Sequence, residues 1–497
     1  MNTNLYALFE RHFPDGAEQP LLVIPNGPVI HYDDIAAASA RYANALVEAG
    51  CKPGDRVAAQ LDKDWRVLAL YLACLRAGLV YLPLNTGYQK AELAYFFGDA
   101  QPTVIVCNAA HLGTVATLGG DATVLTLDEL EDRARSLPTT FVTVFSQPDD
   151  LAAILYTSGT TGRSKGAMLT HRNLASNALA LVEAWGFTRG DVLLHALPIY
   201  HVHGLFVAIH CVLLAGARML WLAKFDAFEV AALLQRATVM MGVPTFYTRL
   251  LVEPTFTRAI AARVRLFVSG SAPMLAETFA AFEAHTGVAV LERYGMTETG
   301  MITSNPLAGT RVGGTVGRPL PGVEVRIAAN AGSDGAPGIG GVEVRGPNIF
   351  PGYWRMPEKT REEFTVDGFF RTGDMGEWVT DDPGRGYLRL IGRAKDLIIT
   401  GGLNVYPKEI EERIDDMAGV AESAVIGMPD PDFGEAVTAV IVGKPGHTLT
   451  EAAVIGALKG EIANFKVPKR VLFVDALPRN AMGKVQKNVL REMFAVR

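Results

Sequence analysis

A run of small polar residues that ends in a lysine is the segment of this sequence best suited to chemistry. Residues 156–168 read YTSGTTGRSKGAM and continue a strand-like run, LAAILYT. Small residues let backbone N–H groups approach an anion closely, hydroxyls add further donors, and Lys165 adds a positive charge. A Gly/Ser/Thr cluster is more often a flexible surface turn, but a plain turn does not need this combination after a buried strand. The segment therefore predicts a polyphosphate-binding loop.

Two better-known motifs do not fit the same residues. A Walker loop has a second glycine directly before its lysine, whereas Ser164 stands in that place here. Residues 162–166, GRSKG, match the G-x-S-x-G pattern of a hydrolase nucleophile elbow, but that serine sits at a sharp turn directly after a strand. Because Ser164 lies well beyond the strand in a polar loop, we expect phosphate binding and not hydrolysis.

Three later segments supply the other groups that a nucleotide reaction needs. In ERYGMTET, Glu298 offers an oxygen ligand for Mg²⁺ and Tyr294 offers a flat face for a purine. In TGD, the carboxylate of Asp374 can accept hydrogen bonds from two adjacent ribose hydroxyls. In PRNAMGKVQK, Lys484 can neutralise the charge that develops during nucleotidyl transfer. Each segment also has a plain structural interpretation: a helix that starts at Thr297 and Glu298, an ordinary turn aspartate, and a solvated surface lysine.

These segments are positioned by a chain whose secondary-structure pattern changes along its length. Through residues 1–390, strand-like runs alternate with helical patterns, as in RVAAQL followed by WRVLALYLACLRAG. Such alternation implies parallel sheets covered by helices. Between 311 and 392, short strands with Gly/Pro turns indicate a β-rich subdomain. We therefore expect an α/β fold with a large N-terminal domain (1–392), a break at 393–396 and a small C-terminal α+β domain (397–497).

Composition limits the class of protein. The 497 residues include 49% hydrophobic and 20% charged residues, with a net charge of −6, as expected for a globular enzyme of two or more lobes. The negative charge argues against nucleic-acid and membrane partners; no pattern indicates an oligomeric state. Four cysteines without C-x-x-C spacing and an amino terminus that carries acids predict a cytoplasmic protein. His195, His201 and His203 have a zinc-like spacing without an HExxH motif or a nearby cysteine, and we expect no zinc site.

Five ordered motifs resemble those of the adenylate-forming superfamily, which includes acyl-CoA synthetases, luciferases and peptide-synthetase adenylation domains. They are YTSGTTGRSKG, ERYGMTET, FRTGD, GRAKDLIITGG and PRNAMGK, and the resemblance covers essentially the whole chain. One departure is Ser164, which stands where many members have proline and should loosen the loop slightly. The resemblance implies ATP, Mg²⁺, coenzyme A as co-substrate, and a mobile C-terminal domain with its hinge at 393–396. A carboxylate would attack the α-phosphate of ATP, and a thiol would then displace AMP.

The resemblance also implies a role for each residue that matches a motif. Lys484 would promote adenylation, His201 would stand beside the carboxylate, and rotation at Lys395 would exchange Lys484 for a glycine loop. The catalytic set would be Lys165, His201, Glu298 and Lys484. The metal ligands would be Thr161 and Glu298. The nucleotide and coenzyme set would be Thr157, Ser158, Gly159, Thr160, Thr161, Gly162, Lys165, Gly270, Ser271, Ala272, Glu292, Arg293, Tyr294, Gly295, Met296, Thr297, Asp374, Arg393, Lys395, Gly401 and Gly402. The acid-binding set would be His201, Arg249, Ser271, Arg293 and Met296.

Two arginines point to the acid substrate. Arg249, on the helix after VPTFY, would face the far end of the acid tunnel, and Arg293 lies beside the adenine motif. Because arginine binds carboxylates bidentately, a short dicarboxylate such as malonate or methylmalonate is expected. The strings HALPIYHVHGLFVA, VPTFYTRLL and ERYGMTETGMITSNP also resemble the malonyl-CoA synthetases of this superfamily. An ion pair of Arg249 with Glu253, another short carboxylic acid, and a stand-alone enzyme that loads a carrier thiol remain open alternatives.

Overall fold

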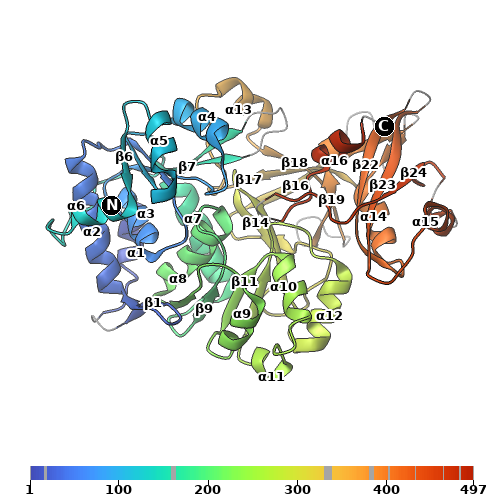
Figure 1. Ribbon diagram of the computed structural model, residues 1–497, viewed down its shortest axis with the longest axis horizontal. Helices are drawn as coiled ribbons and strands as arrows, with labels where there is room; N and C mark the ends of the chain where they lie inside the picture. The colour runs from blue at the N-terminus through green and yellow to red at the C-terminus, as the bar shows by residue number, and fades with distance from the viewer. Residues whose placement is uncertain are drawn as a thin grey trace.

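The fold divides visibly into a large body and a smaller C-terminal lobe, which Figure 1 shows in blue to yellow and in orange to red. The computed structural model describes residues 2–15, 19–157, 164–329, 338–379, 386–400, 403–430, 433–459, 461–462, 464–480 and 483–495. Within these ranges, no helix combines the length and apolar character needed to cross a membrane. The predicted α/β class with parallel-rich sheets is confirmed.

One sheet of the body carries the phosphate-loop segment at its edge. Its strand order is β6-β5-β3-β4-β7-β8, parallel except for the antiparallel pair β7–β8. The runs expected to be buried strands, such as VIVC, are buried on both faces, which is typical of parallel strands between helical layers. The strand bounds are β3 (Arg56–Gln60), β4 (Val80–Pro83), β5 (Val104–Cys107), β6 (Thr123–Thr126), β7 (Leu151–Thr157) and β8 (Lys165–Thr170).

The second sheet of the body carries the other motifs. Its order is β15-β14-β13-β12-β11-β9-β10-β1-β2, parallel from β13 to β1 and antiparallel at both ends. Ligand sites in such sheets lie beyond the carboxyl ends of the parallel strands. The strand bounds are β1 (Pro20–Val23), β2 (Val29–His31), β9 (Val192–His195), β10 (Arg218–Trp221), β11 (Val239–Gly242), β12 (Leu266–Ser269), β13 (Leu291–Met296), β14 (Gly300–Ser304) and β15 (Arg318–Pro319).

Helices join the two sheets into one hydrophobic core. A continuous buried cluster includes strand residues of both sheets together with residues of α3, α7, α8 and the π-helical turn η2. Helix α7 begins with reciprocal hydrogen bonds between Thr170 and Asn173 and ends at Gly186, whose φ is 57°. The helical bounds in the body are α1 (Leu5–Glu10), α2 (Tyr32–Glu48), α3 (Trp65–Arg76), α4 (Lys90–Ala100), η1 (Ala109–His111), α5 (Leu112–Leu118), α6 (Leu127–Ala134), α7 (His171–Trp185), η2 (His203–Ile209), α8 (His210–Ala215), α9 (Ala227–Leu234), α10 (Pro244–Leu251), α11 (Arg258–Ala261) and α12 (Ala276–Thr286).

An antiparallel sheet and a separately packed lobe follow. The sheet order is β16-β17-β18-β19, and the short turn η3 then leads into the C-terminal sheet β21-β20-β23-β22, with β24 beside β23. The main buried cluster of the C-terminal lobe consists of residues from Ile398 onward. The domain boundaries at 392 and 397 and the movement about the hinge stay predictions. The bounds are β16 (Glu324–Ala329), β17 (Gly340–Arg345), α13 (Pro357–Glu363), β18 (Phe370–Trp378), β19 (Leu388–Arg393), η3 (Ala394–Asp396), β20 (Ile398–Thr400), β21 (Leu403–Val405), α14 (Pro407–Asp415), β22 (Val420–Asp430), β23 (Gly434–Gly443), α15 (Glu451–Leu458), β24 (Arg470–Phe473) and α16 (Lys487–Phe494).

Candidate active site

At the end of the site expected to bind phosphate, Tyr353 lies between Lys165 and Glu298. Lys165 begins β8; its Nζ lies 3.4 Å from Glu363 Oε1 and 4.1 Å from the ring centroid of Tyr353. The hydroxyls of Tyr353 and Thr157 each donate to Glu298 Oε1 at 3.1 Å. Tyr353 therefore contacts both the candidate phosphate-binding lysine and the candidate metal-binding carboxylate. The loop residues Ser158, Gly159, Thr160, Thr161 and Gly162 lie outside the described residues.

The Tyr353 hydroxyl is expected to set the affinity for Mg²⁺. Tyr353→Phe keeps the ring face under Lys165 but removes the hydrogen bond to Glu298, and a bond to a charged group contributes about 1.5–3 kcal/mol. We therefore expect the Mg²⁺ concentration for half-maximal activity to rise about tenfold or more. The measurement is pyrophosphate release against free Mg²⁺. An unchanged Mg²⁺ dependence would show that Tyr353 does not orient the carboxylate.

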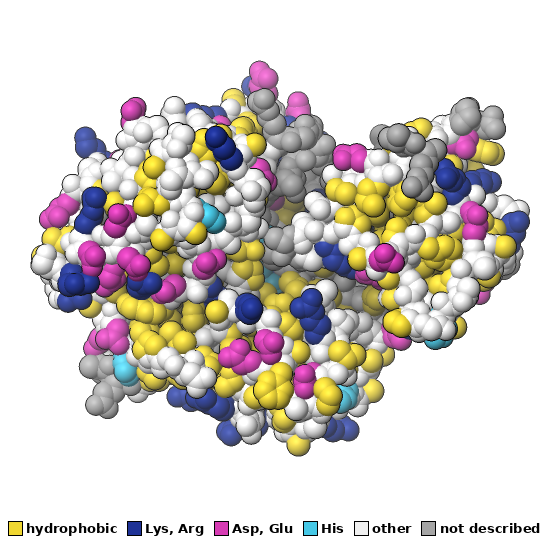
Figure 2. Space-filling view, in the orientation of Figure 1, with side chains coloured by type: hydrophobic (Ala, Val, Ile, Leu, Met, Phe, Trp, Pro, Cys, Tyr) yellow, Lys and Arg dark blue, Asp and Glu magenta, His cyan; other side chains and the backbone are white. Residues whose placement is uncertain are grey.

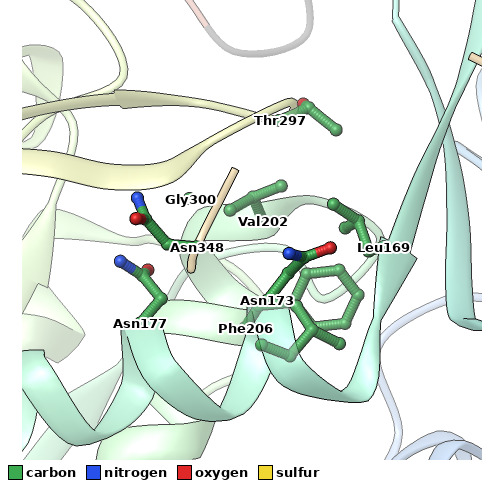
Figure 3. Close-up of a pocket in the computed structure, with 9 residues that line it drawn as sticks. Leu169, Asn173, Asn177, Val202, Phe206, Thr297, Gly300 and Asn348 are labelled. Carbon is green, nitrogen blue, oxygen red and sulfur yellow. The ribbon is translucent and has the colours of Figure 1, made fainter. Parts of the chain in front are cut away.

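Glu298 is held by a turn between two strands. Thr297 and Glu298 lie between β13 and β14, so the alternative that they start a helix is wrong. Behind the turn, Asn177 bonds both backbone groups of Met301, and Asn348 donates to the carbonyl oxygen of Thr299 at 2.8 Å. Figure 3 shows these amides around a cavity of about 10 Å³, roughly the space of one water. Hydrogen bonds from Asn177 of α7 and from Asn348 thus hold the turn that carries the Glu298 carboxylate.

The expected nucleoside end is a chain of three polar side chains. The hydroxyl of Tyr294 donates to Asp374 Oδ2, and Arg393 Nε lies 2.7 Å from Asp374 Oδ1. Asp374 lies within β18 and not in a turn, and Gly373 before it has a φ of 73°. Burial, followed by the charge of Asp374, raises the pKa of Tyr294, so this phenol stays a donor. The carboxylate proposed for the ribose is therefore oriented from both sides.

Other residues predicted for the nucleotide line the same strands and turns. Glu292 is buried, and its Oε1 accepts from the amide of Gly314 at 3.2 Å. Burial raises the pKa of Glu292 to about 7, although hydrogen bonds from the backbone of Gly314 and Met274 oppose the shift. A Cβ on Gly295 would lie 2.1 Å from the Gly300 carbonyl oxygen, so the turn needs glycine. Met296 and Ala272 are half-buried.

The expected acid end is a buried cluster of donors around Arg293. Arg293 is 4% exposed, and its Nε and Nη2 have no hydrogen-bond partner among the described residues. Burial lowers its pKa to about 9, which still leaves it charged at neutral pH. His203 Nδ1 lies 3.2 Å from Ser271 Oγ, and His203 Nε2 is likewise without a partner in the described part of the chain. Burial first, and then Arg293, lowers the pKa of His203 well below its usual value. The cluster can bind an anion.

His201 stands at the edge of this cluster. It is half-buried, and its Nδ1 has no partner within the described ranges. Burial, followed by the charges of Lys484 and Arg293, lowers the pKa of His201 to about 3. His201 is therefore a neutral imidazole at neutral pH, able to contact a carboxylate by hydrogen bonding and not as a cation.

Gly270 is expected to fix the position of the Arg293 guanidinium. A Cβ at this position would lie 2.5 Å from Arg293 Cζ, so the buried guanidinium would have to shift. For Gly270→Ala we therefore expect kcat/KM with the acid substrate to fall about 10- to 100-fold, since small displacements in a site are costly. Steady-state kinetics would measure this. The matched control is Gly98→Ala, where a Cβ meets open space; equal activities of the two variants would contradict the expectation.

The predicted role of Arg249 at the far end of the acid stays a prediction. Arg249 is exposed, while its neighbours on α10, Tyr247 and Leu250, are buried. The helix therefore buries the face that carries Tyr247 and Leu250 and leaves Arg249 accessible to solvent or to a ligand. The alternative ion pair with Glu253 is not formed: the Glu253 carboxylate accepts from the backbone and hydroxyl of Thr255 at 3.0 and 2.8 Å.

Lys484 reaches the site from the C-terminal lobe. Figure 2 shows the surface hollowed between the body and this lobe. Burial is the largest influence on Lys484 and lowers its pKa; Arg393 and Arg293 lower it further, whereas Asp374 and Glu298 raise it. Although much of the side chain is exposed to solvent, these influences place the amine within electrostatic range of all three ends of the site. Gly401 and Gly402 lie outside the described residues, as does the side chain of Lys395.

Sequence reasoning missed two residues that the site uses. Tyr353 lies outside the five motifs, and only the fold brings it into contact with Glu298. The spacing of the histidines suggests only a zinc ligand at His203, and the structure pairs it with Ser271 instead. Ser271 has a φ of 70°, in the left-handed region that non-glycine residues rarely adopt. The small residues Ser269, Gly270 and Ser271 directly at the end of β12 were the available sequence signal.

Comparisons with known proteins agree with this geometry. Two family profiles match the chain: "AMP-binding enzyme" over residues 15–354 and "AMP-binding enzyme C-terminal domain" over residues 409–484. The mouse (Mus musculus) protein "Malonate--CoA ligase ACSF3, mitochondrial" is 38% identical over 90% of this chain and 83% of its own length. "Malonate--CoA ligase" of Arabidopsis thaliana is 36% identical over 89% of this chain and 78% of its own length.

A solved structure is similar over the whole chain. ATP-bound MatB from Rhodopseudomonas palustris superimposes with a TM-score of 0.95 at 55% identity, covering 100% of this chain and 99% of that one. The family profile covers well over half of the sequence, and the fold and the order of the motifs agree with it. The chain therefore belongs to the AMP-binding enzyme family, the adenylate-forming superfamily that the five motifs predicted.

Proposed function

We propose that this chain is an ATP-dependent acid–CoA ligase that converts malonate to malonyl-CoA through malonyl-adenylate, releasing AMP and pyrophosphate. The observation that carries the choice of acid is Arg293, a buried guanidinium with unsatisfied nitrogens in the described structure. The names of the mouse and Arabidopsis relatives support the same acid.

The charge of Arg293 favours a dicarboxylate over a monocarboxylate. A buried charge without a partner is costly, and a substrate that pairs with it recovers that cost. The aliphatic tail of a fatty acid would leave the guanidinium unpaired, whereas the distal carboxylate of malonate can bind it bidentately. His203 and Ser271 supply further hydrogen-bonding groups beside it. Val202, next to His201, and Met301 are buried, and their bulk would decide whether the extra methyl group of methylmalonate fits. Methylmalonate is therefore a second candidate.

The residues at the other ends would hold the nucleotide. Lys165 and the loop before it would bind the β- and γ-phosphates, and Asp374, oriented by Tyr294 and Arg393, would bind the ribose hydroxyls. The oxygen donors of Glu298 and Thr161 suit Mg²⁺, which would neutralise charge on the phosphates. His201 would orient the reacting carboxylate toward the α-phosphate. Lys484 would stabilise the charge that develops as pyrophosphate leaves.

The second half-reaction would need a different arrangement of the C-terminal lobe. Rotation near Lys395 would withdraw Lys484 and bring the Gly401–Gly402 loop to the entry path of coenzyme A. The coenzyme A thiol would then attack the acyl carbon of malonyl-adenylate, and AMP would leave. The four free, buried cysteines support a cytoplasmic location, although the mouse relative is named as mitochondrial.

The test is pyrophosphate release with malonate, methylmalonate, succinate, acetate and octanoate at equal concentrations. Malonate, or malonate with methylmalonate, is expected to give the highest kcat/KM. A preference for acetate or octanoate would instead favour the alternative of another carboxylic acid. AMP release that does not depend on coenzyme A would favour a stand-alone enzyme that loads a carrier thiol.

A further inference from the structure

Lys63 is a half-buried cation whose polar contacts in the described structure are with uncharged groups. It follows β3, and its Nζ lies 2.7 Å from His195 Nδ1 and 2.8 Å from the His195 carbonyl oxygen. The amine also lies 4.3 Å from the ring centroid of Trp221. Burial lowers the pKa of Lys63 well below its usual value, and no acid of the described chain opposes this. A lysine in this setting is costly to retain, so its contact with His195 calls for an explanation.

The contacts of His195 fix its tautomer. Its Nε2 lies 3.0 Å from the carbonyl oxygen of Gly204, which can only accept, so Nε2 must carry the proton. Nδ1 is then an acceptor, and Lys63 donates to it. His195 is 1% exposed, and its ring packs at 5.0 Å from the ring of Trp221. Lys63 is thereby linked through a fixed imidazole to the backbone of Gly204.

Gly204 lies in η2, the π-helical turn that begins with His203. π-Helical turns are rare and often occur at functional sites. A Cβ on Gly204 would lie 1.9 Å from the Pro198 carbonyl oxygen, so this turn is packed closely against the preceding loop. The amide of Leu205 donates to the carbonyl oxygen of His201 at 2.9 Å. The Gly204 carbonyl therefore belongs to the same tightly packed turn as His201 and His203.

The two ends of this link come from different sheets. Lys63 and His195 are 132 residues apart, and they lie beyond β3 of one sheet and at the end of β9 of the other. His195 and Trp221 are direct neighbours on β9 and β10. Both sheets thus meet at their carboxyl edges, where ligands bind in folds of this kind.

We propose that Lys63 is a positioning residue of the acid pocket, which holds the His201–Gly204 turn against Arg293 through His195. The inference rests on the proposed function, because the pocket that it positions is the one assigned to the carboxylates of malonate. Lys63 touches no reacting atom, so its loss should change how malonate binds and not how ATP binds.

The experiment compares two single variants with their combination. Lys63→Met removes the amine and keeps the stem, and His195→Phe keeps a ring against Trp221 and removes both nitrogens. Each should raise the KM for malonate about 10- to 100-fold, the range for loss of a hydrogen bond to a charged group, with little change in the KM for ATP. The double variant should be no worse than the poorer single variant, because both changes break the same link. Lys224→Met, at an exposed lysine beyond β10, is the control and should leave both constants unchanged.

The outcomes separate this inference from the proposed function. If the parent enzyme shows no malonate-dependent pyrophosphate release, the proposed function fails. If the parent is active but the variants lose only thermal stability, with malonate KM unchanged, the positioning role is overturned; additive losses in the double variant overturn it too. Hydrogen exchange of residues 203–209 gives a second readout, because the turn should exchange faster in both single variants. Should Lys63→Met fail to fold, His195→Phe decides the question by the same two measurements.

Discussion

Replacing Arg293 with methionine is expected to lower kcat/KM with malonate by roughly 30- to several-thousand-fold. The distal carboxylate of malonate would then be buried without its partner, which costs about 2–5 kcal/mol, and each 1.4 kcal/mol is about a factor of ten. Acetate has no distal carboxylate, so its lower kcat/KM should change far less. Steady-state pyrophosphate release with both acids measures the difference.

Arg249 provides the matched control for this prediction. It is exposed on α10, so Arg249→Met should leave kcat/KM with malonate nearly unchanged. The sequence alone could not decide between the two arginines, and the pair of variants does so directly. Equal losses for malonate and acetate in the Arg293 variant would remove the argument for a dicarboxylate.

Arg293→Met should also stabilise the substrate-free enzyme. In the free enzyme Arg293 is a buried charge with unsatisfied nitrogens in the described structure, and exchange of such a charge for an apolar side chain is often neutral or stabilising. We expect the Tm of the substrate-free variant to equal or exceed that of the parent. A malonate-dependent rise in Tm should be present in the parent and lost in the variant. A large loss of Tm would instead show that the guanidinium has a structural partner.

The sequence predicted those features that depend on local pattern. Continuous apolar runs such as VIVC predicted buried parallel strands, and β5 lies there. The Gly/Ser/Thr segment predicted a loop between β7 and a lysine, and Lys165 does begin the next strand. Local motifs carry this information because turn, strand and loop chemistry is decided by neighbouring residues.

The direction of the Arg249 side chain depends on the phase of a helix. Tyr247 and Leu250 are three residues apart and share the buried face of α10, so a residue two positions after Tyr247 must point away from it. The apolar pattern of PTFYTRLL already contained that information. By contrast, Arg293 lies on a strand whose residues 291–294 are all buried, and no alternation could reveal the direction of its side chain.

Contacts between distant segments were beyond the reach of the sequence. Tyr353 meets Glu298 across 55 residues, and Lys63 meets His195 across 132 residues. Neither pair has a spacing or motif of its own, because the packing of the two sheets brings them together. The π-helical form of residues 203–209 was equally hidden, since its apolar sequence is compatible with an ordinary buried helix.

Replacing Lys484 with alanine should slow adenylation about 10²- to 10³-fold, the cost of removing one preorganised group that stabilises developing charge. The amine lies within electrostatic range of Glu298, Asp374 and Arg293, and it comes from the C-terminal lobe. Formation of malonyl-CoA from supplied malonyl-adenylate should stay close to the parent rate, because the proposed rotation withdraws Lys484 before the thiol reacts.

The two half-reactions can be measured separately in one preparation. Malonate-dependent exchange of pyrophosphate with ATP follows adenylation, and coenzyme A-dependent AMP release from malonyl-adenylate follows thioester formation. Lys459→Ala, a change at an exposed lysine of the same lobe, is the control and should leave both rates unchanged. If Lys484→Ala slows both half-reactions equally, the lysine would act in a single fixed arrangement of the two lobes. A loss confined to adenylation is the result expected if the lobe that carries Lys484 moves between the two steps.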